Sequence, residues 1–166
     1  MELKPVSPPP ADVQVEFRKT LGRFCTGVTV LTAHDGPEVH GMTANAFMSV
    51  SLDPPLVVVS IDRNAHMHSL MGKGTKYGVS VLSHEQQPLS DYFAKRWTGE
   101  PPGFEIEYVV GTPLIKGAVA HLAAEVIDDY WGGDHTLFLG IVGYTRWEDT
   151  RPLLFFGGKY LQLTPD

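Results

Sequence analysis

The sequence predicts a mainly β protein with short helices, built as an antiparallel β-barrel. Segments rich in β-branched residues outnumber segments in which apolar residues recur at helical spacing. Most neighbouring segments are joined by short turns such as Asp35-Gly36, which favours an antiparallel barrel over a doubly wound parallel sheet. A chain of 166 residues is long enough for one domain with a full core.

The composition argues against several classes of protein. A net charge of −6 disfavours a nucleic-acid-binding surface, because phosphate contacts need clustered Lys and Arg. The single cysteine, Cys25, excludes an internal disulfide framework, and we expect it to be a buried small hydrophobe rather than a nucleophile. No apolar run approaches about 20 residues, and the first residues lack the apolar core of a signal peptide. We therefore expect a cytoplasmic protein.

The first elements are an arm, a helix and two strands. Residues 1–11 are proline-rich and predict a flexible N-terminal arm before a domain at 12–166. Apolar residues at helical spacing predict an amphipathic helix over Asp12–Phe24, with Gly27 as a plausible stop. Strands are then expected at Val28–Ala33 and Val39–Phe47.

The stretch Gly41–Ile61 combines a small-residue segment with a proline corner and an apolar run. Leu56–Val59 predicts a strand buried on both faces, and Pro55 belongs at its start because proline has no N–H for the ladder. Small side chains beside a buried sheet let another molecule approach the backbone closely, as a site for a flat ligand requires. An ordinary barrel hairpin explains the same pattern equally well.

The remaining elements alternate strands with short helices. Asn64 is the expected N-cap of a helix over Ala65–Met71. Ser83 and Gln86 suit a capping box, but a helix that begins nearer Gln87-Pro88 keeps proline out of its interior. The other expectations are a strand at 77–82, an exposed excursion at 97–113, long strands at 118–128 and 136–147 joined across 132–134, and a last strand at 153–156.

Two histidine-containing segments could support chemistry. His66 and His68 would point nearly opposite ways in a helix, and no third metal ligand is evident, so a metal site is not expected. His135 stands where the Gly132-Gly133-Asp134 turn meets a strand, and a neutral imidazole there can hydrogen-bond or stack on a ligand. The alternative is a turn whose polar groups satisfy only local backbone.

Two further segments carry polar groups. Thr43-Ala44-Asn45 offers a hydroxyl and an amide suited to the rim of a planar heteroaromatic ring, or simply a polar strand end. Asn64-Ala65-His66 opens a helix whose free N–H groups suit a phosphate, with Lys95-Arg96 as possible added positive charge or plain surface charge.

Four segments together resemble the flavin reductase family that supplies reduced flavin to two-component monooxygenases. The resemblance runs from about residue 12 to 160. The segments are Phe17-Arg18 through Thr26–Val30, Gly41–Asn45 followed by Ser49–Leu56, Gly133–Gly140, and Pro152–Tyr160.

The resemblance implies a split β-barrel, a homodimer, FMN or FAD near the dimer interface, and NADH or NADPH as electron donor. Carried over by position, it implies these roles: Thr43, Ala44 and Asn45 at the isoalloxazine edge, Val50 and Ser51 beside the ring and ribityl chain, Ser60 with Asn64, Ala65 and His66 at the phosphate end, Phe93 closing over the flavin, and His135 at the nicotinamide. Ala65 and His66 replace the Ser or Thr that members often carry, and Asp62 adds a negative charge nearby. The choice between FMN and FAD therefore stays open.

Two functions follow from this resemblance. The first is an NAD(P)H:flavin oxidoreductase that supplies a partner monooxygenase, which needs no protein nucleophile because the flavin carries the electrons. The second is a non-catalytic flavin-binding electron carrier or sensor on the same fold.

Overall fold

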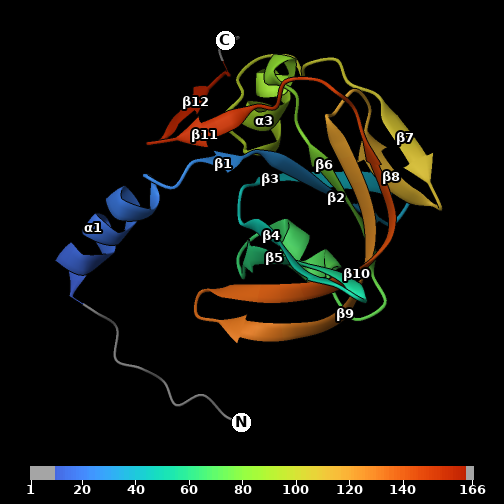
Figure 1. The fold of residues 1–166 in the computed structure, drawn as a ribbon, viewed down its shortest axis with the longest axis horizontal. Coiled ribbons are helices and arrows are strands. Elements are labelled where there is room, and N and C mark those ends of the chain that lie inside the picture. The colour runs from blue at the N-terminus through green and yellow to red at the C-terminus, as the bar shows by residue number, and fades with distance from the viewer. Residues whose placement is uncertain (1–9, 164–166) are drawn as a thin grey trace.

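The computed structural model describes residues 10–163, which form a mainly antiparallel β structure with short helices (Figure 1). The helices are α1 (Ala11–Leu21), α2 (His66–Leu70) and α3 (Gln87–Phe93), with a 3₁₀ turn at His84–Gln86. The strands are β1 (Thr26–Gly27), β2 (Thr29–Asp35), β3 (Glu38–Ala44), β4 (Phe47–Leu52), β5 (Pro55–Asp62), β6 (Lys76–Val81), β7 (Ile106–Val109), β8 (Thr112–Ile115), β9 (Ala120–Gly132), β10 (His135–Trp147), β11 (Leu154–Phe156) and β12 (Lys159–Leu161).

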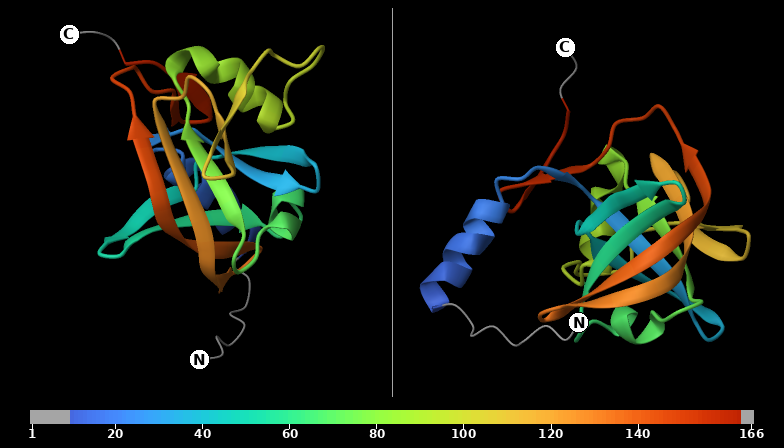
Figure 2. Two further views of the ribbon diagram at one scale, coloured as in Figure 1. Left: turned by 90° about the vertical axis from the view of Figure 1, so that its right-hand side faces the viewer. Right: turned by 60° about the horizontal axis from the view of Figure 1, so that its bottom comes forward.

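Seven strands form one antiparallel sheet in the order β3-β2-β6-β9-β10-β5-β4. Its two edge strands, β3 and β4, are consecutive in the chain, so the connection between them brings the edges of the curled sheet together (Figure 2). The short helix α2 packs against β2, β3 and β5. This arrangement confirms the prediction of an antiparallel split β-barrel.

The core divides into two apolar clusters. The larger cluster fills the inside of the barrel with fully buried side chains, among them Leu31, Val59 and Tyr77. The smaller cluster joins the start of β2 to α3 and the C-terminal strands through Val30 and Leu153. Among the described residues, no helix has both the length and the apolar content needed to cross a membrane.

The strand after the proline corner has one inward and one outward face. As predicted, β5 begins at Pro55, but the prediction that it is buried on both faces is wrong. Val57, Val59 and Ile61 point into the barrel, whereas Leu56, Val58 and Ser60 are only half-buried. The apolar composition of the outward positions misled the prediction, because Val58 points into an open groove described below, which Ser60 also lines.

Several predicted boundaries also change. The expected strand at 39–47 breaks at Asn45-Ala46 into β3 and β4, and the expected exposed excursion at 97–113 contains β7 and the start of the buried strand β8. Strand β12 was not predicted. Ala65, rather than Asn64, is the N-cap of α2, because the backbone N–H and the side-chain amide of Asn64 both donate to Asp62. The preferred start of the helix nearer Gln87-Pro88 is confirmed by α3, and the alternative capping box of Ser83 and Gln86 also forms, at the 3₁₀ turn before it.

The N-terminal helix stands away from the barrel (Figure 2). It begins at Ala11 and ends at Leu21, with Gly22 as C-cap, three residues before the expected end. Its apolar side chains are exposed, as are Phe24 and the thiol of Cys25, so the expectation of a buried Cys25 is wrong. Most of the arm predicted for residues 1–11 lies outside the described residues.

Candidate functional site

A groove of about 600 Å³ lies between α1 and the outer face of the sheet. Strand pairing builds its floor, because Ser60 faces Leu137 across β5 and β10, and Met48 faces Val58 across β4 and β5. Side chains opposite one another in such a ladder share a face, so these four point out of the barrel together. The lining residues are Phe17, Arg18, Leu21, Gly22, Phe24, Thr26, Asn45, Ala46, Phe47, Met48, Val58, Ser60, Leu137 and Phe155.

A second, more polar pocket of about 310 Å³ adjoins this groove. The two share Asn45 and Phe155, so they form one continuous depression along the end of β3. Its lining residues are Val28, Thr43, Ala44, Asn45, Ser90, Ala94, Arg96, Phe155 and Tyr160. The depression therefore has one apolar end and one end rich in hydrogen-bonding groups.

A hydrogen-bond network fixes the wall of the polar pocket. Arg96 donates to the Tyr160 hydroxyl at 2.7 Å, and that hydroxyl donates to the Asp91 carboxylate at 3.0 Å. Burial raises the pKa of the Tyr160 phenol, so it remains a neutral donor. Thr43 donates its hydroxyl proton to the Ser90 carbonyl at 2.7 Å, which ties β3 to α3. The Arg96 charge is thus already engaged by Asp91 and Tyr160.

Asn45 lies at the border of the groove and the polar pocket, where β3 ends. Its amide nitrogen makes only a long bond of 3.4 Å to the Thr26 hydroxyl. The next residue, Ala46, accepts a backbone bond of 3.0 Å from Ser60, which holds the break between β3 and β4 against β5. The exposed Asn45 amide therefore keeps hydrogen-bonding capacity for a ligand.

His135 lies at the far end of the same outer face. It faces Asp62 at the end of β5, two residues along each strand from the Ser60–Leu137 pair, or about 7 Å. Its Nδ1 donates to the Asp134 carboxylate at 2.8 Å, because a carboxylate can only accept. This bond holds the pKa of Asp134 below its ordinary value. Among the described residues, Nε2 of His135 has no hydrogen-bond partner.

His66 points away from the groove, toward the β2–β3 hairpin. Its Nε2 lies 2.7 Å from the Asp35 carboxylate, and its ring meets His40 edge to face at 4.7 Å between centroids. Burial lowers the pKa of His40, and the neighbouring His66 and Lys95 lower it further. His68 instead bonds Thr136 at 2.8 Å, so the two histidines diverge as expected for a helix. Residues 10–163 contain no cluster able to hold a metal ion.

The structure brings some predicted site residues together and separates others. Thr43, Ala44, Asn45 and Ser60 line the continuous depression, while Asn64, Ala65, His66 and His135 lie beyond its walls, around the end of β5.

Three predicted site residues lie elsewhere. Val50 and Ser51 sit at a β-bulge of β4 outside the lining of the depression. Phe93 does not cover the groove; it packs on Gly41 so closely that any Cβ there would overlap its ring, and it meets Tyr92 and Phe104 edge to face. The Phe93 ring is held in an aromatic cluster in this arrangement, and its role over a ligand stays a prediction.

Sequence reasoning missed several lining residues. Phe17 and Leu21 lie in the predicted amphipathic helix, and Phe155 and Tyr160 lie in or next to the predicted last strand, and none of the four was assigned to the site. The sequence carries one signal for Phe155 and Tyr160, because the two residues flank Gly157 and Gly158 and two adjacent glycines indicate a tight turn. In the structure this turn joins β11 and β12 in a hairpin beside α3.

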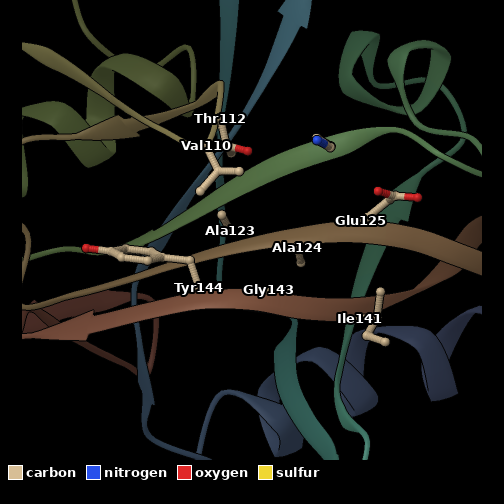
Figure 3. Close-up of a pocket in the computed structure, with 9 residues that line it drawn as sticks. Val110, Thr112, Ala123, Ala124, Glu125, Ile141, Gly143 and Tyr144 are labelled. Carbon is tan, nitrogen blue, oxygen red and sulfur yellow. The ribbon is translucent and has the colours of Figure 1, made fainter.

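A separate cavity of about 300 Å³ lies between β6, β9, β10 and the β7–β8 turn (Figure 3). Tyr144 and Val110 flank it above a floor that includes Ala123, as Figure 3 shows. It contains no predicted site residue, so it does not belong to the site described above.

Comparison with known proteins decides the family. The model of the flavin reductase like domain matches residues 21–164. The chain belongs to this family. The matched range includes the β3–β4 break, the end of β5 and the β9–β10 turn, which are the parts that build the depression and carry His135.

Individual relatives agree with this membership across nearly the whole flavin reductase-like domain. An NADH-dependent flavin reductase of Rhodococcus is 43% identical over 157 residues, covering 93% of this chain and 89% of the relative. The styrene monooxygenase flavin reductase of Pseudomonas putida superposes with a TM-score of 0.83 at 38% identity, covering 90% of this chain and 98% of that one. The NADH:FAD oxidoreductase of Streptomyces globisporus, solved with NAD and FAD fragments, gives 0.84 at 39% identity, covering 97% and 99%.

Proposed function

We propose that this protein is an NADH-dependent flavin reductase that reduces FMN or FAD and supplies the reduced flavin to a partner monooxygenase. The observation that carries the proposal is the continuous depression, apolar beside α1 and polar around Thr43 and Asn45, with His135 beyond one end. Relatives over nearly the full length are named as NADH-dependent flavin reductases, which supports both the donor and the acceptor.

The lining residues suit an isoalloxazine ring. Its faces are apolar and its pyrimidine edge carries carbonyl and N–H groups, which match the side chains of Met48, Val58 and Leu137 on one side and the Asn45 amide on the other. We assign the ring to this groove and the ribityl chain to the direction of Ser60. The phosphate end then points toward Asn64, Ala65 and His66.

The protein's contribution is binding and orientation, since a bound flavin supplies the redox chemistry. A hydrogen bond joins Nε2 of His135 to the carboxamide of the pyridine nucleotide. Asp134 holds the imidazole in that orientation through the 2.8 Å bond to Nδ1. The apolar groove excludes water from the ring, and the short side chains of Thr43 and Ala44 allow backbone groups to reach its edge.

We also propose that the enzyme is a homodimer whose interface covers α1 and the outer face of β4, β5 and β10. Phe17, Phe24 and Met48 are 63%, 73% and 60% exposed, although each is a large apolar side chain. Surfaces of this kind usually mark interaction sites, and a second copy would close the open side of the groove. Because reduced pyridine nucleotide is a cytoplasmic metabolite, we place the reaction in the cytoplasm.

The test is a spectroscopic assay of the purified protein. Added to NADH and free FMN or FAD, it should consume NADH at a rate proportional to enzyme concentration, with NADPH as the comparison donor. A protein that retains yellow flavin but consumes neither donor would instead be an electron carrier reduced by another protein. Absence of both consumption and retained flavin would reject the proposed function altogether.

A further inference from the structure

The groove that we assign to the flavin ring contains one charged side chain among its described lining residues. This is Arg18, in the middle of α1, and the other lining residues are apolar, glycine or uncharged polar. Unlike Arg96, which is tied to Asp91 and Tyr160, Arg18 makes no ion pair or side-chain hydrogen bond with any of residues 10–163. A cation on an otherwise apolar wall has no structural partner there, so it is available to a ligand.

The charge of Arg18 reaches the end of the groove where His135 lies. The hydrogen bond from His135 is the main cause of the lowered pKa of Asp134, and the attraction of Arg18 adds to it. Arg18 therefore lies near enough to the β9–β10 turn for its charge to act there, and it lines the same groove as Ser60 and Leu137.

The reaction creates a negative charge in the bound ring. NADH transfers a hydride from nicotinamide C4 to flavin N5, so the C4–H bond breaks, an N5–H bond forms, and both electrons move with the hydrogen. NADH becomes NAD⁺ and, because no proton accompanies the hydride, the neutral oxidised flavin becomes a reduced flavin with one negative charge spread over N1 and the C2 oxygen. A cation beside such a ring favours the product over the reactant.

We propose that Arg18 makes the groove bind the reduced, anionic flavin in preference to the oxidised, neutral flavin. This inference rests on the proposed function, because it needs the ring to lie in the groove. Its consequence is a bound flavin with a higher midpoint potential and a product held long enough to be transferred before oxygen in solution reacts with it.

The contrasting role for the same charge is attraction of phosphate groups. A phosphate carries its charge in both redox states, so an arginine that binds it strengthens both states equally. The ratio of the two affinities therefore separates the two roles, whereas the affinity for oxidised flavin alone does not.

The experiment compares Arg18→Gln, Arg18→Lys and the control Arg23→Gln with the unchanged protein. Arg23 follows the same helix, but its guanidinium lies over the Phe156 ring at 5.7 Å and does not line the groove. Dissociation constants for oxidised and chemically reduced FMN are measured anaerobically by fluorescence at mildly alkaline pH, and the midpoint potential of bound FMN by spectroelectrochemistry.

We expect Arg18→Gln to lower the preference for reduced over oxidised FMN about tenfold, equivalent to a midpoint potential lower by about 30 mV for this two-electron couple. Arg18→Lys should keep most of the preference, and Arg23→Gln should leave it unchanged. An unchanged ratio in Arg18→Gln, or equal weakening of both redox states, would overturn the inference while leaving the proposed function intact. Failure of the unchanged protein to bind either form would refute the proposed function itself, and this inference with it.

Discussion

Replacing His135 with alanine should raise the KM for NADH while leaving the affinity for oxidised flavin nearly unchanged. The imidazole side chain is 38% exposed, and its one hydrogen-bond partner within residues 10–163 is the neighbouring Asp134, so its loss disturbs little of the fold. What disappears is the free Nε2 at the end of the groove. A single neutral hydrogen bond contributes about 0.5–1.5 kcal/mol, which corresponds to an increase in KM of about 2- to 12-fold.

The assay for this prediction follows NADH consumption at saturating FMN over a range of NADH concentrations. A separate titration gives the dissociation constant for oxidised FMN. His84→Ala is the matched control, because His84 bonds the Arg151 backbone and lines neither the groove nor the polar pocket. The assigned role of His135 is refuted if KM stays constant, or if flavin affinity falls as much as KM rises.

Two further predictions concern assembly and pH. Leu139→Asp places a carboxylate on the outer face of the sheet, opposite Val58 and outside the lining of the groove. An unpaired charge that is buried in an interface costs about 3–5 kcal/mol. Light scattering should therefore show monomers at concentrations where the unchanged protein is a dimer, and a persistent dimer would place the interface elsewhere. The pKa of His40 is lowered by burial and by the nearby charges of His66 and Lys95, and Asp35 opposes them. His40 therefore binds a proton more readily in the unfolded protein than in the folded one. Its contribution to stability is present above pH 6.5, the ordinary pKa, and falls as the pH drops below that value. The free energy of unfolding of His40→Gln, measured with urea, should therefore depend less steeply on pH in that range than that of the unchanged protein.

The sequence predicted the elements whose local chemistry decides their structure. The Asp35-Gly36 turn, the start of β5 at Pro55, the start of α3 at Gln87-Pro88 and the turn before His135 all depend on neighbouring residues. The spacing of apolar residues and the residue types at turns were therefore sufficient to predict an antiparallel barrel.

The errors occur where distant segments decide the outcome. The half-buried outer side of β5 could not be recognised, because Leu56 and Val58 are as apolar as the inward positions and differ only in what packs on them. Cys25 was expected to be buried for the same reason. The packing of Phe93 on Gly41 could not be foreseen either, because this contact joins residues far apart in the chain.

The candidate site shows the same division. Thr43, Ala44 and Asn45 were found because small and polar residues at a strand end are visible in the sequence itself. Arg18 and Leu137 were missed, because only the pairing of β5 with β10 and the placement of α1 bring them to one groove. Arg96 was weighed as added positive charge for a phosphate or as plain surface charge, and the structure instead ties it to Asp91 and Tyr160.

The central claim is that a flavin ring occupies the groove between α1 and the sheet, and a pair of matched substitutions tests it most directly. Val58→Trp fills the floor of that groove, whereas Val110→Trp adds the same side chain at the separate cavity in Figure 3. Calorimetric titration with FMN and with FAD should show saturable binding to the unchanged protein and to Val110→Trp, and binding at least about tenfold weaker, or about 1.4 kcal/mol, to Val58→Trp. Undiminished binding to Val58→Trp would contradict the account.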